Sequence, residues 1–165
     1  MALRDILTKE DPILRKHSRE VTDFGKKTSD LIDDLLETVV KAEGLGLAAP
    51  QVGVLRRAVV VYDGEKFVAL VNPQIVEQSG SVTRSEACLS CPGESGIVVR
   101  PQKVTVRALD REGQSFEMTC EDMAARAVCH ELDHLDGVLF IDVAKEISED
   151  ENEEGTGEEE LPDLR

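Results

Sequence analysis

The stretch CHELDHLDG (129–137) contains two histidines four residues apart, His130 and His134, with Glu131 directly after the first. Side chains four residues apart lie on one face of a helix, so both imidazoles can bind the same metal ion. The glutamate beside them can then act as a general base on water. The simpler alternative is a solvated helix whose histidines and acids face only water. Because the chain has only three histidines and a glutamate stands at the catalytic position, we favour a metal site.

A metal site that does chemistry needs a third protein ligand and an open coordination position. Downstream of the histidines, Phe140 stands where one class of HExxH protease has a ligating histidine. A second class would use a downstream glutamate, but Glu153 and Glu154 lie in a tail that we expect to be disordered. The third ligand is therefore expected upstream of the helix.

The stretch SEACLSCPGES (85–95) offers two thiols upstream, Cys88 and Cys91, in a C-x-x-C spacing. Both cysteines with both histidines would make a closed structural zinc site, and the two thiols alone would make a redox pair. A closed site would leave Glu131 and the glycine-rich loop at 44–53 without a purpose, so we favour a three-ligand site with one thiolate. We expect Cys120 and Cys129, and whichever of Cys88 and Cys91 is not the ligand, to be small buried hydrophobes.

The elements that must position these residues follow from the apolar periodicity. Residues 29–44 carry one broad apolar face at helical spacing, and Gly44 is expected to stop that helix. Helical spacing returns at 121–135, where Thr119 with Asp122 forms a capping-box pattern. Between the helices, β-branched runs predict strands at 57–62, 66–73, 95–101 and 103–110. This order predicts an α+β fold, with mainly antiparallel or mixed sheets packed around the metal-binding C-terminal helix.

Length and charge set wider limits. With 165 residues, 41% of them hydrophobic, the chain is one domain's worth of globular protein. The formal net charge is −15, and residues 145–165 hold ten acidic and two basic side chains, a charge of −8. We therefore expect a catalytic domain at 1–147 and an acidic, disordered tail at 148–165. This negative charge argues against non-specific electrostatic binding to nucleic-acid phosphates.

The N-terminus and the cysteines indicate a location inside the cell. The segment MALRDILTKEDP is charged within its first five residues and has no apolar core, so we expect no secretory signal. No apolar run approaches the length needed to cross a bilayer. Four bunched cysteines fit a reducing compartment better than a disulfide framework. A cytoplasmic location is the expectation.

Three segments together resemble a known family. GLGLAAPQ (44–51), EACLS (86–90) and HELDH (130–134) are similar to the three signature motifs of peptide deformylases, in the same order and spacing. The resemblance runs from about residue 1 to about residue 145. It implies that one divalent metal is bound, with water in the fourth position, by three ligands: Cys88, His130 and His134. In that family the ion is usually Fe(II), and zinc or nickel can substitute; the ligand types suit all three.

The resemblance also implies roles for the neighbouring residues. Glu131 would take a proton from the water and pass it to the leaving amine. The Gln51 side chain and the Leu89 backbone N–H would meet the developing oxyanion. An extended peptide would lie along the loop as an added strand, at three substrate-binding residues: Gly44, Leu45 and Gly46.

The implied reaction removes the formyl group from N-formyl-methionyl peptides and yields formate and a free amine. The partners would be nascent chains, with transient ribosome contact, no direct reading of nucleic acid and no membrane. Two features depart from the family: Ala87 replaces the usual glycine, and the C-terminus is acidic where some members have a basic helix that contacts the ribosome. The competing interpretations are an HExxH metallopeptidase and an inactive homologue that binds metal and peptide N-termini.

Overall fold

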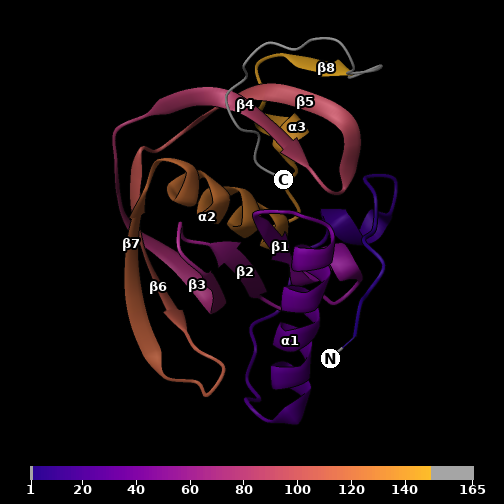
Figure 1. Ribbon diagram of the computed structural model, residues 1–165, viewed down its shortest axis with the longest axis vertical. Coiled ribbons are helices and arrows are strands. Elements are labelled where there is room, and N and C mark those ends of the chain that lie inside the picture. Colours follow the sequence, from indigo (N-terminus) through magenta and orange to yellow (C-terminus); the bar gives the residue numbers. More distant parts are fainter. Residues whose placement is uncertain (1, 150–165) are drawn as a thin grey trace.

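The computed structural model describes residues 2–149. Its elements run, in chain order, η1 (Pro12–Arg15), α1 (Lys26–Lys41), β1 (Gly46–Ala48), η2 (Ala49–Val52), β2 (Ala58–Tyr62), β3 (Phe67–Ser79), β4 (Val82–Cys88), β5 (Cys91–Arg100), β6 (Lys103–Leu109), β7 (Ser115–Glu121), α2 (Asp122–Leu135), α3 (Phe140–Val143) and β8 (Ile147–Glu149). The strands form two antiparallel sheets, in the orders β1-β2-β3-β6-β7 and β4-β5-β8. Helix α2 lies between the sheets, and α1 stands beside the larger one (Figure 1). The α+β class expected from the sequence is confirmed.

Strand β2 is buried on both faces because a different helix covers each face of the larger sheet. Val59 packs in one cluster with Val128 of α2, and its neighbour Val60 packs in another with Leu35 of α1. Successive side chains of a strand point to opposite faces, so this division follows from the strand itself. It explains why the run at 58–62 is apolar throughout rather than alternating.

Helix α2 presents different faces to the two sheets. Val128 and Leu135 pack in the core cluster of the larger sheet. Arg126, His130 and His134, each four residues from the next, contact groups of β4 and β5 in the smaller sheet. A helix packed on both sides therefore carries an apolar stripe toward one sheet and a polar stripe toward the other.

Helix ends differ from the sequence expectation. Helix α1 ends at Lys41, and Glu43 rather than Gly44 takes the left-handed conformation, with φ of 58°. Thr119 does not cap α2, because it lies in β7 and its hydroxyl is 2.8 Å from that of Thr105. The N-cap of α2 is Glu121, and no side chain caps it. The predicted capping box is therefore wrong, since strand pairing takes up the residue that the local pattern had placed at the helix start.

Four of the described strands were not predicted from the sequence, namely β1, β4, β7 and β8. None of the four carries a continuous β-branched run, and β7 forms an edge of the larger sheet, where its residues are mostly exposed. The last strand, β8, pairs Ser148 with Ser95 and Glu149 with Glu94, so described structure continues two residues beyond the expected boundary at 147/148. The rest of the expected tail, 150–165, lies outside the described residues.

Within residues 2–149, none of the helices combines the length and the apolar character that crossing a membrane requires.

Candidate metal centre and active site

The three expected metal ligands come from two elements that the fold brings together. Cys88 ends β4, and His130 and His134 lie on consecutive turns of α2. Their ligand atoms lie within 4.8 Å of one another, and all three residues are buried. The Cys88 Sγ and His134 Nε2 atoms are 3.4 Å apart. Zinc-like bond lengths in a tetrahedral site would separate them by about 3.6 Å, so the donors fit a metal of that kind.

His130 is oriented by a buried carboxylate on β4. The Nδ1 atom lies 2.9 Å from Oε1 of Glu86, which is fully buried. Although burial opposes ionisation, hydrogen bonds from Arg100 and His130 hold the pKa of Glu86 well below its usual value. An ionised carboxylate only accepts hydrogen bonds, so Nδ1 carries the hydrogen, and the tautomer with this hydrogen has its lone pair on Nε2. In the described part of the chain that Nε2 is buried without a hydrogen-bond partner, as expected of a metal ligand.

The surroundings of His134 leave it in the protonation state that binds a metal, but those of Cys88 leave it protonated. Burial, with a smaller effect from His130, lowers the pKa of His134 well below its usual value, so the imidazole is neutral and able to ligate. The hydrogen bond with Cys91, together with burial, raises the pKa of the Cys88 thiol. A bound cation would reverse this preference, because a coordinating thiol loses its proton.

Glu131 is buried and packed against the backbone of β1. Burial raises the pKa of Glu131 well above its usual value, and the charge of Glu86 adds to the shift. Its Oε1 atom has no hydrogen-bond partner among residues 2–149. A Cβ atom at Gly46 would come within 2.7 Å of Oε2 of Glu131. Gly46 thus makes room for the glutamate, a reason that the sequence did not reveal.

Gln51 is held beside the cysteine ligand. It lies on η2, is 1% exposed, and its Oε1 accepts a hydrogen bond from the backbone N–H of Ala48 at 2.9 Å. Its Nε2 donates to Ser90 Oγ at 3.0 Å and lies 3.7 Å from Cys88 Sγ. Leu89 occupies the turn between β4 and β5, directly after the cysteine. The two expected oxyanion donors therefore flank the same ligand.

The expected peptide-binding residues lie at an edge of the larger sheet. Gly46 begins β1, which pairs only with β2 among the described strands. Leu45 extends this pairing, since its carbonyl accepts from the N–H of Tyr62 at 2.9 Å. Gly44 connects the strand to the end of α1. The second edge of β1 is thus geometrically suited to an added strand.

Four residues near the metal centre, beyond the expected site residues, form a hydrogen-bond network. Arg100 donates to both carboxylate oxygens of Glu86, at 2.8 and 2.9 Å. Arg126 also donates to Glu86, and Asp133 accepts from Arg100 at 2.8 Å. The spacing of Arg126 four residues before His130 was the available signal, because it places both side chains on one face of α2.

The remaining cysteines and the third histidine lie outside the ligand cluster. Cys120 and Cys129 sit in the core of the larger sheet, where burial raises the pKa of each to about 11. Cys91 packs beside Val98 and is not among the clustered donors. His17 is exposed. The positions of the three cysteines agree with the expectation of small buried thiols.

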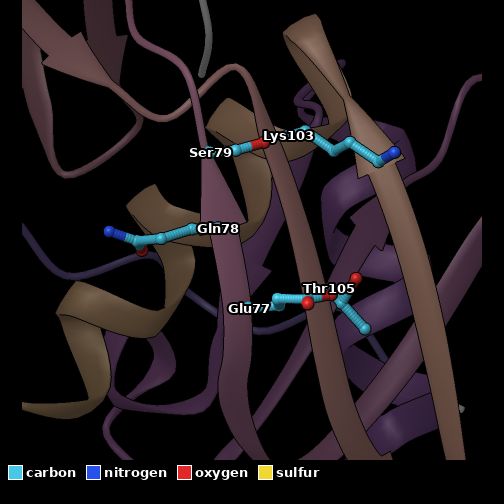
Figure 2. A pocket seen from close by; sticks show the side chains of 5 residues that line it. All are labelled: Glu77, Gln78, Ser79, Lys103 and Thr105. Carbon is cyan, nitrogen blue, oxygen red and sulfur yellow. The ribbon is translucent and has the colours of Figure 1, made fainter.

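A polar depression of about 280 Å³ on the larger sheet is a separate feature (Figure 2). Residues of β3 and β6 line it, namely Glu77, Gln78, Ser79, Lys103 and Thr105. None of these five belongs to the cluster around Cys88, His130 and His134. The depression is therefore not part of the candidate active site.

The profile of the polypeptide deformylase family matches residues 3–150. This chain belongs to the polypeptide deformylase family. A peptide deformylase of Caldicellulosiruptor bescii is 54% identical over 155 residues, which are 93% of each chain. The solved peptide deformylase of Legionella pneumophila has a TM-score of 0.84 and 44% identity over 87% of each chain. That of Thermotoga maritima has a TM-score of 0.85 and 36% identity, covering 88% of this chain and 100% of the other.

The family resemblance inferred from the three motifs is therefore confirmed. The expected enzyme class, a hydrolase that removes the formyl group from nascent polypeptides, is confirmed as well. The alternatives, an HExxH metallopeptidase and an inactive homologue, are not favoured. Peptide deformylases are metalloenzymes, and this member has a cysteine–histidine cluster able to hold a metal.

Proposed function

We propose that this deformylase holds one divalent metal with Cys88, His130 and His134 and uses Glu131 to carry the proton. The observation that carries the proposal is the convergence of three buried donor atoms within 4.8 Å on one side of α2. Glu131 follows the first of the histidine ligands and is buried against β1. This arrangement suits hydrolysis of an amide better than a closed structural site, because it uses three protein donors rather than four.

The residues would act on the formyl amide in a defined order. A metal held by the three donors would act as a Lewis acid, polarising the formyl carbonyl and lowering the pKa of a bound water. Oε1 of Glu131 would accept the proton of the attacking water and pass it to the leaving amine. The Nε2 amide of Gln51 and the N–H of Leu89 donate to the carbonyl oxygen as it gains charge.

The substrate would bind as an extended peptide along β1. Its backbone would pair with Leu45 and Gly46 at the edge that β2 does not occupy, with Gly44 at the entrance. Backbone pairing does not depend on the substrate side chains that follow the methionine. This independence suits an enzyme that acts on nascent chains of every sequence. We place this activity in the cytoplasm, in transient contact with the ribosome from which nascent chains emerge.

We propose Fe(II) as the physiological metal, with zinc and nickel as substitutes. One thiolate and two imidazoles suit several first-row metals, so the ligand set is compatible with all three. Fe(II) beside a thiolate is open to oxidation. Aerobic purification should therefore lose activity, and reconstitution with nickel or cobalt should restore a stable form. Equal and stable activity of an iron-containing protein in air and under nitrogen would contradict this assignment.

The deciding experiment is an assay of formate release from a formyl-Met tripeptide, with metal content measured after purification without oxygen. The same protein is offered the unblocked tripeptide as a control. We expect formate, one metal per chain and no cleavage of the peptide bonds. Cleavage of the unblocked peptide would indicate an endopeptidase, and bound metal without either product would indicate an inactive homologue.

A further inference from the structure

Arg126 is a buried arginine whose hydrogen bonds all leave the helix that carries it. It is 2% exposed and lies on α2. Its Nη1 donates to Oε2 of Glu86 and, at 3.1 Å, to the carbonyl of Val98; its Nη2 donates to the carbonyl of Val82 at 2.7 Å. The three acceptors lie on β4 and β5. One planar guanidinium therefore joins the helix to two strands of the smaller sheet.

The same carboxylate links Arg126 to a metal ligand. Arg126 donates to Oε2 of Glu86, while Nδ1 of His130, one turn further along α2, lies 2.9 Å from Oε1. Arg100 holds both oxygens from β5, the strand paired with β4. Of the two arginines, only Arg126 comes from the helix that carries the histidines. Arg126 therefore ties the carboxylate to that helix directly, whereas Arg100 reaches the helix through Asp133.

The link also reaches the cysteine ligand. Cys88 follows Glu86 by two residues on β4, and both histidine ligands lie on α2. A shift of β4 relative to α2 would move the thiol away from the two imidazoles. Arg126 bonds to β4 at Val82 and at Glu86, so it resists that shift at two points.

We propose that Arg126 is a positioning residue of the metal centre, holding Glu86 so that His130 directs Nε2 toward Cys88 and His134. The inference rests on the proposed ligand set of this deformylase. Groups that orient a ligating histidine commonly change metal affinity by about 10- to 100-fold when they are removed. A residue that merely stabilised the fold would change the unfolding midpoint and leave the metal affinity unaltered.

Arg57 provides a matched control within the same fold. It is also an arginine that holds α2, with Nη1 3.1 Å from the carbonyl of Leu135 and Nη2 3.0 Å from Asp136. It has no recorded contact with Glu86 or with the three ligands. Replacing Arg57 removes a helix anchor of comparable kind without touching the carboxylate.

The test uses the full chain and its affinity for Co²⁺, measured by competition with a chromophoric chelator. We expect Arg126→Met to raise the Kd for Co²⁺ about tenfold or more and to change the visible spectrum of the bound cobalt. Arg57→Met should lower the urea midpoint while keeping the Kd and the spectrum of the wild type. An unchanged Kd and spectrum in Arg126→Met would overturn the positioning role. Failure of the wild type to bind Co²⁺ would instead overturn the ligand set, which is a different result.

Two further variants keep the proposal open to refutation if Arg126→Met does not fold. Lysine keeps the charge but lacks the planar fork, so Arg126→Lys should fold and weaken Co²⁺ binding in the same direction by a smaller factor. An Arg126→Lys protein with wild-type affinity would then overturn the proposal. In a Glu86→Gln background, Arg126→Lys should weaken binding little further, because both act through one carboxylate. If the two substitutions weakened Co²⁺ binding additively, Arg126 would not act through Glu86.

Discussion

Cys88 and Cys91 face each other across the β4–β5 hairpin, yet only one of them reaches the histidines. The two residues are paired in the strand register on either side of a two-residue turn. Cys88 Sγ lies 3.4 Å from Nε2 of His134, whereas Cys91 is absent from the cluster of ligand atoms among the described residues. Spacing in the sequence could not separate the two thiols, because it does not say which of them the helix approaches.

Replacing Cys88 with alanine should abolish metal binding, and Cys91→Ala should leave the metal content nearly unchanged. The reason is that only the first thiol converges with His130 and His134. Metal per chain, measured by atomic emission after anaerobic purification, checks the prediction, and Cys91→Ala is the matched control. Loss of metal from Cys91→Ala with retention by Cys88→Ala would reverse the ligand assignment.

Replacing Glu131 with glutamine should leave the metal bound and lower kcat by a factor on the order of 10²–10⁴, as expected for a lost general base. Glutamine keeps the shape that fits against Gly46 but cannot accept a proton. Formate release and metal content are measured on the same preparation. Near-normal turnover by Glu131→Gln would exclude the proposed proton carrier.

At the scale of elements, the close approach of β1 to α2 determines where the glutamate sits. A Cβ atom at Gly46 would lie 2.7 Å from Oε2 and 2.8 Å from Cγ of Glu131, distances that force one of them to move. Side chains near the reacting atoms tolerate little displacement, because misplacement by about 1 Å can lower a rate about 100-fold. Gly46 of the first motif therefore leaves the space that Glu131 of the third motif occupies.

Gly46→Ala should consequently lower kcat about 10- to 100-fold while leaving the metal bound, since the ligands themselves are not displaced. Gly25→Ala is a suitable control, because a Cβ atom there would meet only Asp23 Oδ1, at 3.3 Å. Steady-state deformylation and metal content are the measurements. A Gly46→Ala enzyme with wild-type kcat would show that Glu131 adapts to the methyl group.

At the scale of the whole molecule, strand β8 extends the domain beyond the expected boundary at 147/148. Strand β8 places Ile147, Ser148 and Glu149 beside β5. We still propose that the tail contributes nothing to the catalytic domain, because its composition offers little to bury and its charges repel one another. Because Ser148 and Glu149 belong to β8, we place the cut after Glu149 rather than after Ile147.

Truncation after Glu149 should leave the thermal midpoint and the turnover of a short formyl-Met peptide within error of the full chain. Truncation after Ile147 removes two of the three residue pairs between β5 and β8 and should lower the thermal midpoint slightly. Differential scanning calorimetry of both truncated chains checks this. A large loss of stability on removing 150–165 alone would show that those residues belong to the domain.

Several features could be predicted from the sequence because each depends on local spacing. The periodicity of 121–135 predicted α2, and the β-branched run at 57–62 predicted β2. The HELDH spacing placed His130 and His134 on one face, and the three motifs identified the family. Local patterns succeed here because helical and strand periods are properties of consecutive residues.

The tertiary structure alone decided the surroundings of the metal ligands. Glu86, Arg100, Arg126 and Asp133 meet through hydrogen bonds that span 14 to 40 positions of the chain. No local pattern marks such a network, because its members share no period and come from β4, β5 and α2. The reason Gly46 must be a glycine is equally remote, since the contact is with Glu131. The sequence identified the chemical groups of the site. Their relative positions depend on how two sheets pack against one helix, which is set by long-range contacts.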